Sequence, residues 1–121
     1  MKYVCLVHFA PELLDQMAPA ELQSLQQRCL AYDEELADSG TQIVAEALQS
    51  PDTAVLVKVR EGNVTTTDGP FIETKEQLGG FILIEARDLN HAIRVAAGIP
   101  MAQLGTIEVR PIYTPPGALE R

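Results

Sequence analysis

The sequence predicts an α+β fold in which two β-α-β units share one antiparallel sheet. The first observation is the order of segments along the chain: strand, helix, strands, then strand, helix, strand. The second is that each helical segment carries one apolar stripe, so each helix buries a single side. Right-handed crossovers then place both helices on one face of the sheet, which is the ferredoxin-like plan.

The chain begins with a strand and a long helix. Residues 2–9 (KYVCLVHF) are apolar on both alternating faces, as in a central strand, and residues 10–18 are predicted to be a loop. A helix is expected from Pro19, a typical first-turn residue, to Gly40, a typical residue after a helix end. Its apolar stripe recurs at spacings of three and four: Leu22, Leu25, Cys29, Tyr32 and Leu36.

Strands are expected in the middle of the chain. Residues 41–48 and 54–60 are predicted strands separated by the breaker QSPDT. The three valines of 54–60 share one face, which we expect to meet the helices. Glu61-Gly62-Asn63 is a turn signal, so residues 64–67 (VTTT) are expected to return antiparallel as a short hairpin arm.

The second unit repeats the pattern of the first. Residues 81–86 are a predicted strand, Asp88 is a suitable helix N-cap, and residues 106–112 close the sheet. The intervening helix is expected to end at Gly98 and to bury one apolar face: Leu89, Ala92, Ile93 and Ala96. Residues 1–113 therefore form one domain, and residues 114–121, with two prolines and no periodicity, form a C-terminal extension.

Two helices leave the second face of such a sheet uncovered. In residues 106–112 the apolar positions Ile107 and Val109 alternate with charged ones, and we expect the apolar pair to meet the helices. By the same alternation, five charged residues are predicted on the open face: Lys58, Arg60, Glu85, Glu108 and Arg110. This face is either a solvated surface laced with ion pairs or, under a second subunit, the wall of a polar ligand cavity.

Composition argues against several classes of function. Seventeen acidic and nine basic residues give a net charge of −8, and no Lys/Arg cluster is present, so direct nucleic-acid binding is not expected. No apolar run approaches the roughly 20 residues of a spanning helix, and no signal peptide is evident, so we expect a cytoplasmic protein without membrane contact. Cys5 and Cys29 lie far apart, which predicts two reduced, buried thiols and no metal site. No cofactor fingerprint is present.

The segment TDGPFIETKEQLGGF (67–81) is the most distinctive stretch of the chain. An aspartate before glycine usually bonds the amide two residues on, but here that residue is Pro70, which has no N–H. Asp68 is therefore either a cap of the Phe71 amide or the acid or base of a functional site. Phe71 is expected to anchor the loop in the core.

Other polar residues are further candidates for the site. Lys75 and Glu73 form either a solvated charge run or a ligand-binding pair in which Lys75 holds a carboxylate. Gly79-Gly80 leads into a strand rather than a helix, so it is not a phosphate-binding loop. His8, at the end of the first strand, is either structural or the partner of Asp68 in an acid–base pair.

The distinctive segment also carries a resemblance. The pattern V-x-x-x-DGPF-x-E-x-KE-x-x-GGF, followed by DL-x-x-AI and by EVRP in the last strand, resembles the DGPF subgroup of YCII-related proteins. This resemblance implies a dimeric α+β barrel in which two ferredoxin-like sheets face each other. Broader relatives are suspected small-molecule enzymes with a histidine–aspartate pair, but the first long helix here has no histidine and only Asp68 corresponds. The DGPF subgroup is often encoded beside extracytoplasmic-function sigma factors.

These observations lead to alternative functions. The first is a homodimer whose facing sheets enclose a polar pocket for proton transfer on a small organic substrate, without cofactor or metal. In it Asp68 and His8 are the catalytic pair, and four residues bind the ligand: Lys75, Glu73, Arg110 and Glu108. The second is a non-catalytic binding or regulatory module linked to a sigma factor, and the third is a structural dimer whose own side chains fill the pocket.

Overall fold

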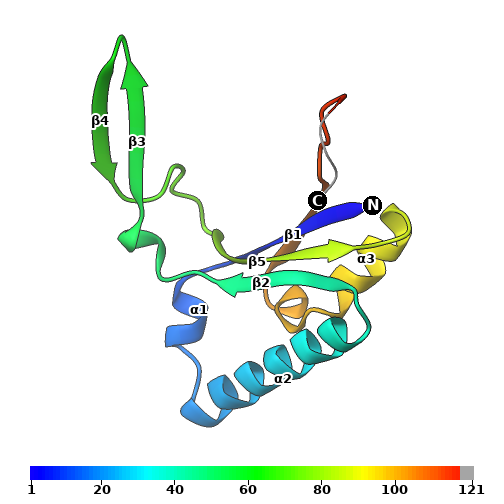
Figure 1. The fold of residues 1–121 in the computed structure, drawn as a ribbon. Coiled ribbons are helices and arrows are strands. Elements are labelled where there is room, and N and C mark those ends of the chain that lie inside the picture. Colours follow the sequence, from blue (N-terminus) through cyan, green and yellow to red (C-terminus); the bar gives the residue numbers. More distant parts are fainter. Residues whose placement is uncertain (118–121) are drawn as a thin grey trace.

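A computed structural model describes residues 1–117, and its architecture confirms the predicted α+β class (Figure 1). Within the predicted extension, 114–121, the last four residues lie outside the described part of the chain. The elements, in order, are β1 (Lys2–Phe9), α1 (Glu12–Asp15), α2 (Pro19–Asp38), β2 (Gln42–Ala47), η1 (Pro51–Thr53), β3 (Val55–Arg60), β4 (Asn63–Asp68), β5 (Gln77–Glu85), α3 (Leu89–Gly98), η2 (Pro100–Gln103) and β6 (Thr106–Pro111).

Four strands form the main sheet, in the order β2-β5-β1-β6, and every neighbouring pair is antiparallel. The central position of β1 agrees with its apolar character on both faces. Tyr3, Cys5 and Val7 of β1 are buried beside Ile82 and Ile84 of β5, and these side chains form the sheet side of the core.

The two longer helices lie on the same side of the main sheet (Figure 1). From α2, Leu25 and Leu36 are buried, as the predicted stripe requires. From α3 the buried residues are Ala92, Val95 and Ala96, whereas Leu89 and Ile93 are each 49% exposed. The predicted stripe of α3 was therefore wrong at two positions, because Val95 belongs to the buried side and turns Leu89 and Ile93 toward solvent.

The two ends of α3 are held by side chains. The Asp88 carboxylate accepts a hydrogen bond from the His91 backbone N–H at 2.8 Å, which confirms the predicted N-cap. At the other end the Tyr32 hydroxyl, from α2, donates to the Val95 carbonyl at 2.6 Å. This bond ties α2 to the last turn of α3.

Strands β3 and β4 form a separate two-stranded hairpin that projects from the body of the molecule (Figure 1). Its turn residues Glu61 and Gly62 both have positive φ, 51° and 79°, as a two-residue turn of this hand requires. The hairpin arm was predicted, but its place was not: Val55, Val57 and Val59 are 56%, 63% and 55% exposed and do not meet the helices. Alternation shows which residues share a face, not which sheet receives that face.

Two boundaries also differ from the predictions. The predicted loop 10–18 contains the single-turn helix α1, and β5 begins at Gln77, four residues before the predicted start at Phe81. The early start includes Gly79 and Gly80, which lie within β5. Any side chain at Gly79 would collide with the ring of Phe9, so glycine lets this ring pack against the strand. The glycine pair is thus architectural.

Among residues 1–117, no helix combines the length and the apolar character needed to cross a bilayer.

Candidate functional site

The sheet face turned away from the helices has an apolar centre. In the strand register Leu6 lies opposite Phe81, and Val4 lies opposite Leu83. These four side chains are partly exposed, in contrast to their buried neighbours on the other face. Across from Leu83 on β2, Val44 is 37% exposed and extends the same patch. The open face is therefore an apolar surface in the centre of the sheet, which no helix of the described chain covers.

A polar cluster borders this apolar centre along β1 and β6. The His8 Nε2 atom lies 3.0 Å from Glu108 Oε1, and Arg110 Nε lies 3.9 Å from Glu108 Oε2. The His8 side chain is 26% exposed, while Glu108 and Arg110 are 47% and 68% exposed. Three of the predicted site residues thus lie together, on the face where alternation placed Glu108 and Arg110.

The cluster has the parts of an acid–base site. A carboxylate only accepts hydrogen bonds, so in the neutral imidazole the proton lies on Nε2, which donates to Glu108. The Nδ1 atom of His8 then has a free lone pair and can accept a proton. Glu108 fixes the orientation of the ring, and the exposed guanidinium of Arg110 can pair with a carboxylate or a similar anion.

Two residues that the sequence analysis missed join the edge of this cluster. Thr106 lies opposite His8 in the register of β1 and β6. Its hydroxyl donates to Glu76 Oε1 at 2.8 Å. The end of the distinctive segment therefore reaches the open face near His8, through Glu76 rather than through Asp68. The only sequence signal for Glu76 was its place in the KE pair of the motif.

Asp68 lies elsewhere. It is the last residue of β4, opposite Val55, where the Gly69 N–H donates to the Ala54 carbonyl at 2.8 Å. In the described chain no hydrogen bond joins Asp68 to His8, and the exposed Asp68 carboxylate makes no hydrogen bond or ion pair. Within residues 1–117 the carboxylate that contacts His8 belongs to Glu108, and the pairing of His8 with Asp68 stays a prediction.

The loop after Asp68 is exposed and is organised by Gln77. The Gln77 side-chain amide donates to the carbonyls of Ile72, at 2.7 Å, and Thr74, at 3.0 Å. Phe71 is 77% exposed, so the prediction that it anchors the loop in the core was wrong. The pattern did not reveal that hydrogen bonds from the Gln77 side chain to backbone carbonyls, rather than an apolar anchor, shape the loop.

The remaining charged candidates are scattered. The side chains of Lys75 and Glu73 are exposed in the loop, and within residues 1–117 neither makes a hydrogen bond or an ion pair. Lys58 and Arg60 lie on the projecting hairpin, so their predicted place on the open face of the main sheet was wrong. Glu85 does lie on that face, opposite Lys2, where its carboxylate is 3.5 Å from the N-terminal amine.

A cavity of about 610 Å³ lies on the opposite, helix-covered side of the sheet. None of the six predicted site residues lines it. Its walls come from α2, β2, β5 and η2, with contributions from β1 and α1, and they are mostly apolar. This cavity was not predictable from the sequence, because the apolar stripe of α2 does not show how closely the helix packs against each strand.

The fold and the polar cluster define a small α+β protein with one helix-covered and one open sheet face. The YCII-related domain matches residues 1–115, and the chain belongs to this family. It is also similar to the uncharacterized protein R00369 of Rhizobium meliloti (strain 1021), with 41% identity over 61 residues. That alignment covers 49% of this chain and 49% of the relative, so the chain spans about half of the curated protein it matches.

Proposed function

We propose that the chain acts as a homodimer in which the open faces of two sheets meet, so that two ferredoxin-like protomers form a dimeric α+β barrel. The antiparallel order β2-β5-β1-β6 with both longer helices on one side supports this plan. The apolar centre around Leu6 and Phe81 supports it as well, since a second copy would remove this surface from water. The motif from Asp68 to Phe81 supports membership of the DGPF subgroup.

We further propose that this dimer handles protons on a small organic anion. The observation that carries the proposal is the 3.0 Å contact between His8 Nε2 and Glu108 Oε1 on the open face. His8 Nδ1 acts as the base and returns the proton as the acid, while Glu108 orients the ring. Arg110 holds the anionic group of the substrate. Desolvation by the partner sheet strengthens each of these interactions.

The two histidines of the chain, His8 and His91, make this proposal directly testable by NMR. Their ring signals are recorded while small oxo acids and hydroxy acids, which are anions at neutral pH, are added one at a time in deuterated water. At least one compound is expected to shift the His8 signals, leave those of His91 in place, and exchange a carbon-bound proton for solvent deuterium. His91 serves as the internal control, because it lies at the start of α3 rather than on the open face.

Three variants sharpen the test. H8Q should stop the exchange, and R110Q should weaken binding of the same compound by about tenfold or more, because a charge-assisted contact is lost. E108Q keeps the size of the side chain but removes its charge, and it should slow the exchange. Exchange that continues unchanged in H8Q would contradict the acid–base role.

The projecting hairpin favours a second candidate function, a non-catalytic module that contacts another protein. Val57 and Val64 are 63% and 65% exposed, and a lone two-stranded hairpin is marginally stable in water. A partner such as an extracytoplasmic-function sigma factor would cover these valines. Sedimentation velocity with a purified sigma factor of the same organism tests this function: V57D should abolish complex formation, and binding by V57D equal to that of wild type would contradict it.

A further inference from the structure

We infer that the cavity between α2 and the helix-covered face of the sheet binds a small apolar molecule that carries one hydrogen-bond donor. The cavity of about 610 Å³ falls within the roughly 300–1,000 Å³ typical of small-molecule sites. It is separate from the cluster of His8 and Glu108, which lies on the other face of the sheet. This binding site therefore does not depend on the acid–base function.

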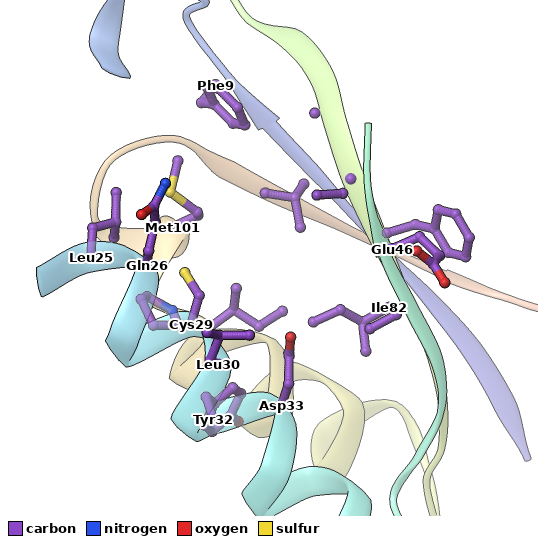
Figure 2. Close-up of a pocket in the computed structure, with 18 of the residues that line it drawn as sticks. Phe9, Leu25, Gln26, Cys29, Leu30, Tyr32, Asp33, Glu46, Ile82 and Met101 are labelled. Atoms are coloured by element: carbon purple, nitrogen blue, oxygen red, sulfur yellow. The ribbon is translucent and has the colours of Figure 1, made fainter. Parts of the chain in front are cut away.

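Both walls of the cavity include small residues. Figure 2 shows Cys29 and Asp33 on α2 directed toward the space, with Ile82 of β5 on the opposite wall. On the sheet side, Ala45 of β2 and the backbone of Gly80 also line it. Because Cys29, Ala45 and Gly80 are small, part of the space between the helix and the two strands stays unfilled.

Local packing keeps the cavity from being filled by simple changes. A side chain at Gly80 would approach the Glu46 carbonyl oxygen to 2.9 Å, so this wall stays bare. The bond from the Tyr32 hydroxyl to the Val95 carbonyl fixes α2 against α3, and buried Leu25 and Leu36 fix the helix on either side of Cys29. α2 is therefore held at several points around the open space and cannot simply collapse onto β2.

The lining is apolar apart from a few groups on α2. Leu25, Ile82 and Met101 are buried apolar residues in its walls. Burial, and then the nearby Asp33 carboxylate, raise the pKa of the Cys29 thiol, so the thiol is neutral at pH 7 and adds to the apolar lining. Such walls favour an apolar ligand, because each apolar contact removes surface from water.

Asp33 supplies the polar recognition. Its carboxylate lines the cavity, and within residues 1–117 it makes no hydrogen bond or ion pair. Burial raises the pKa of Asp33, so the charged form is less well solvated here than in water. A hydroxyl or amine of the ligand would satisfy this carboxylate, whereas an anionic ligand would be repelled. The chemistry is therefore that of an apolar alcohol or amine.

The experiment uses two fluorescent probes that share one skeleton. N-phenyl-1-naphthylamine is neutral, apolar and carries one N–H donor, while 1-anilinonaphthalene-8-sulfonate adds a sulfonate. The amine probe is expected to bind saturably with one site per chain and at least about tenfold more tightly than the sulfonate. In D33N, which keeps the shape of the side chain, this preference should fall severalfold. Wild-type protein that fails to bind the amine probe would overturn the proposal.

Filled variants test whether the probe occupies this cavity. The pair C29F and A45F, alone and together, place rings in the space from α2 and from β2, and binding should weaken by about tenfold or more. A31F is the matched control, because Ala31 is exposed on the same helix and does not line the cavity. Equal affinity in the filled double variant and in A31F would refute the assignment.

Alkylation supplies a readout in unmodified protein. N-ethylmaleimide should modify Cys29 more slowly when the amine probe is bound. Cys5 is fully buried, and burial raises the pKa of its thiol to about 11, so it should stay unmodified throughout. Protection of Cys29 by the probe supports binding in the cavity, and an unchanged rate at saturating probe overturns it.

Discussion

Replacing Tyr32 with phenylalanine should destabilise the protein without changing its fold. The Tyr32 hydroxyl donates to the Val95 carbonyl at 2.6 Å, between α2 and the last turn of α3. The last four carbonyls of a helix have no partner within it, and the Ile99 N–H donates to Ala96 rather than to Val95. The Tyr32 hydroxyl therefore supplies the hydrogen-bond donor that the Val95 carbonyl would otherwise lack. We expect a loss of about 1–2 kcal/mol of unfolding free energy.

Urea unfolding and thermal melting at one fixed protein concentration measure this loss. For a chain of this length, 1–2 kcal/mol corresponds to a lowering of Tm by about 4–8 °C. Y113F is the matched control, since Tyr113 is 77% exposed, and it should leave both quantities unchanged. A Y32F variant as stable as Y113F would refute the claim that this bond holds α2 against α3. Fixed concentration matters because the stability of a dimer depends on it.

Three further predictions follow from described contacts. D68A should change the free energy of unfolding, measured in urea, by no more than about 0.5 kcal/mol, because the exposed Asp68 carboxylate has no partner within residues 1–117. A loss of about 1 kcal/mol or more would show that this carboxylate caps the loop. D33N should be more stable than wild type at pH 7, and this difference in unfolding free energy should vanish below the ordinary Asp pKa of 3.8. The reason is that the Asp33 carboxyl binds its proton more tightly in the folded than in the unfolded wild type, so wild type gains stability as pH falls through the raised pKa toward 3.8. A difference that stays constant across the pH series would contradict this. In hydrogen exchange, amides of β3 and β4 should exchange much faster than those of β1 in dilute protein, and equal protection would mean that the hairpin is covered.

Local patterns were sufficient where the structure depends on neighbouring residues. The strand Lys2–Phe9 was predicted from a short run that is apolar on both faces, and the helix from Pro19 was predicted from apolar residues at spacings of three and four. Asp88 was predicted as an N-cap because its bond to the His91 amide spans only three residues. The alternation in β6 also assigned Glu108 to the open face, since a strand sends successive side chains to opposite sides.

Placement in three dimensions was beyond such patterns. The valines of β3 alternate in the same way whether the strand joins the main sheet or a separate hairpin, so their exposure was not predictable. His8 and Glu108 lie 100 residues apart, and their contact depends on the register of β1 with β6. Asp68 drew attention because its motif is unusual, but an unusual motif does not reveal which residues contact it.

Sedimentation equilibrium of wild type and L6K would decide whether the open faces of two sheets meet in a dimer. Leu6 lies in the apolar centre of the open face, opposite Phe81 and Glu108, so a lysine there can pair with Glu108 in a monomer but would bury a charge in a dimer. I93K, on the exposed side of α3, is the matched control. Wild type and I93K are expected to form dimers, and L6K is expected to be a monomer. A wild-type monomer at all concentrations, or an L6K dimer as tight as wild type, would contradict it.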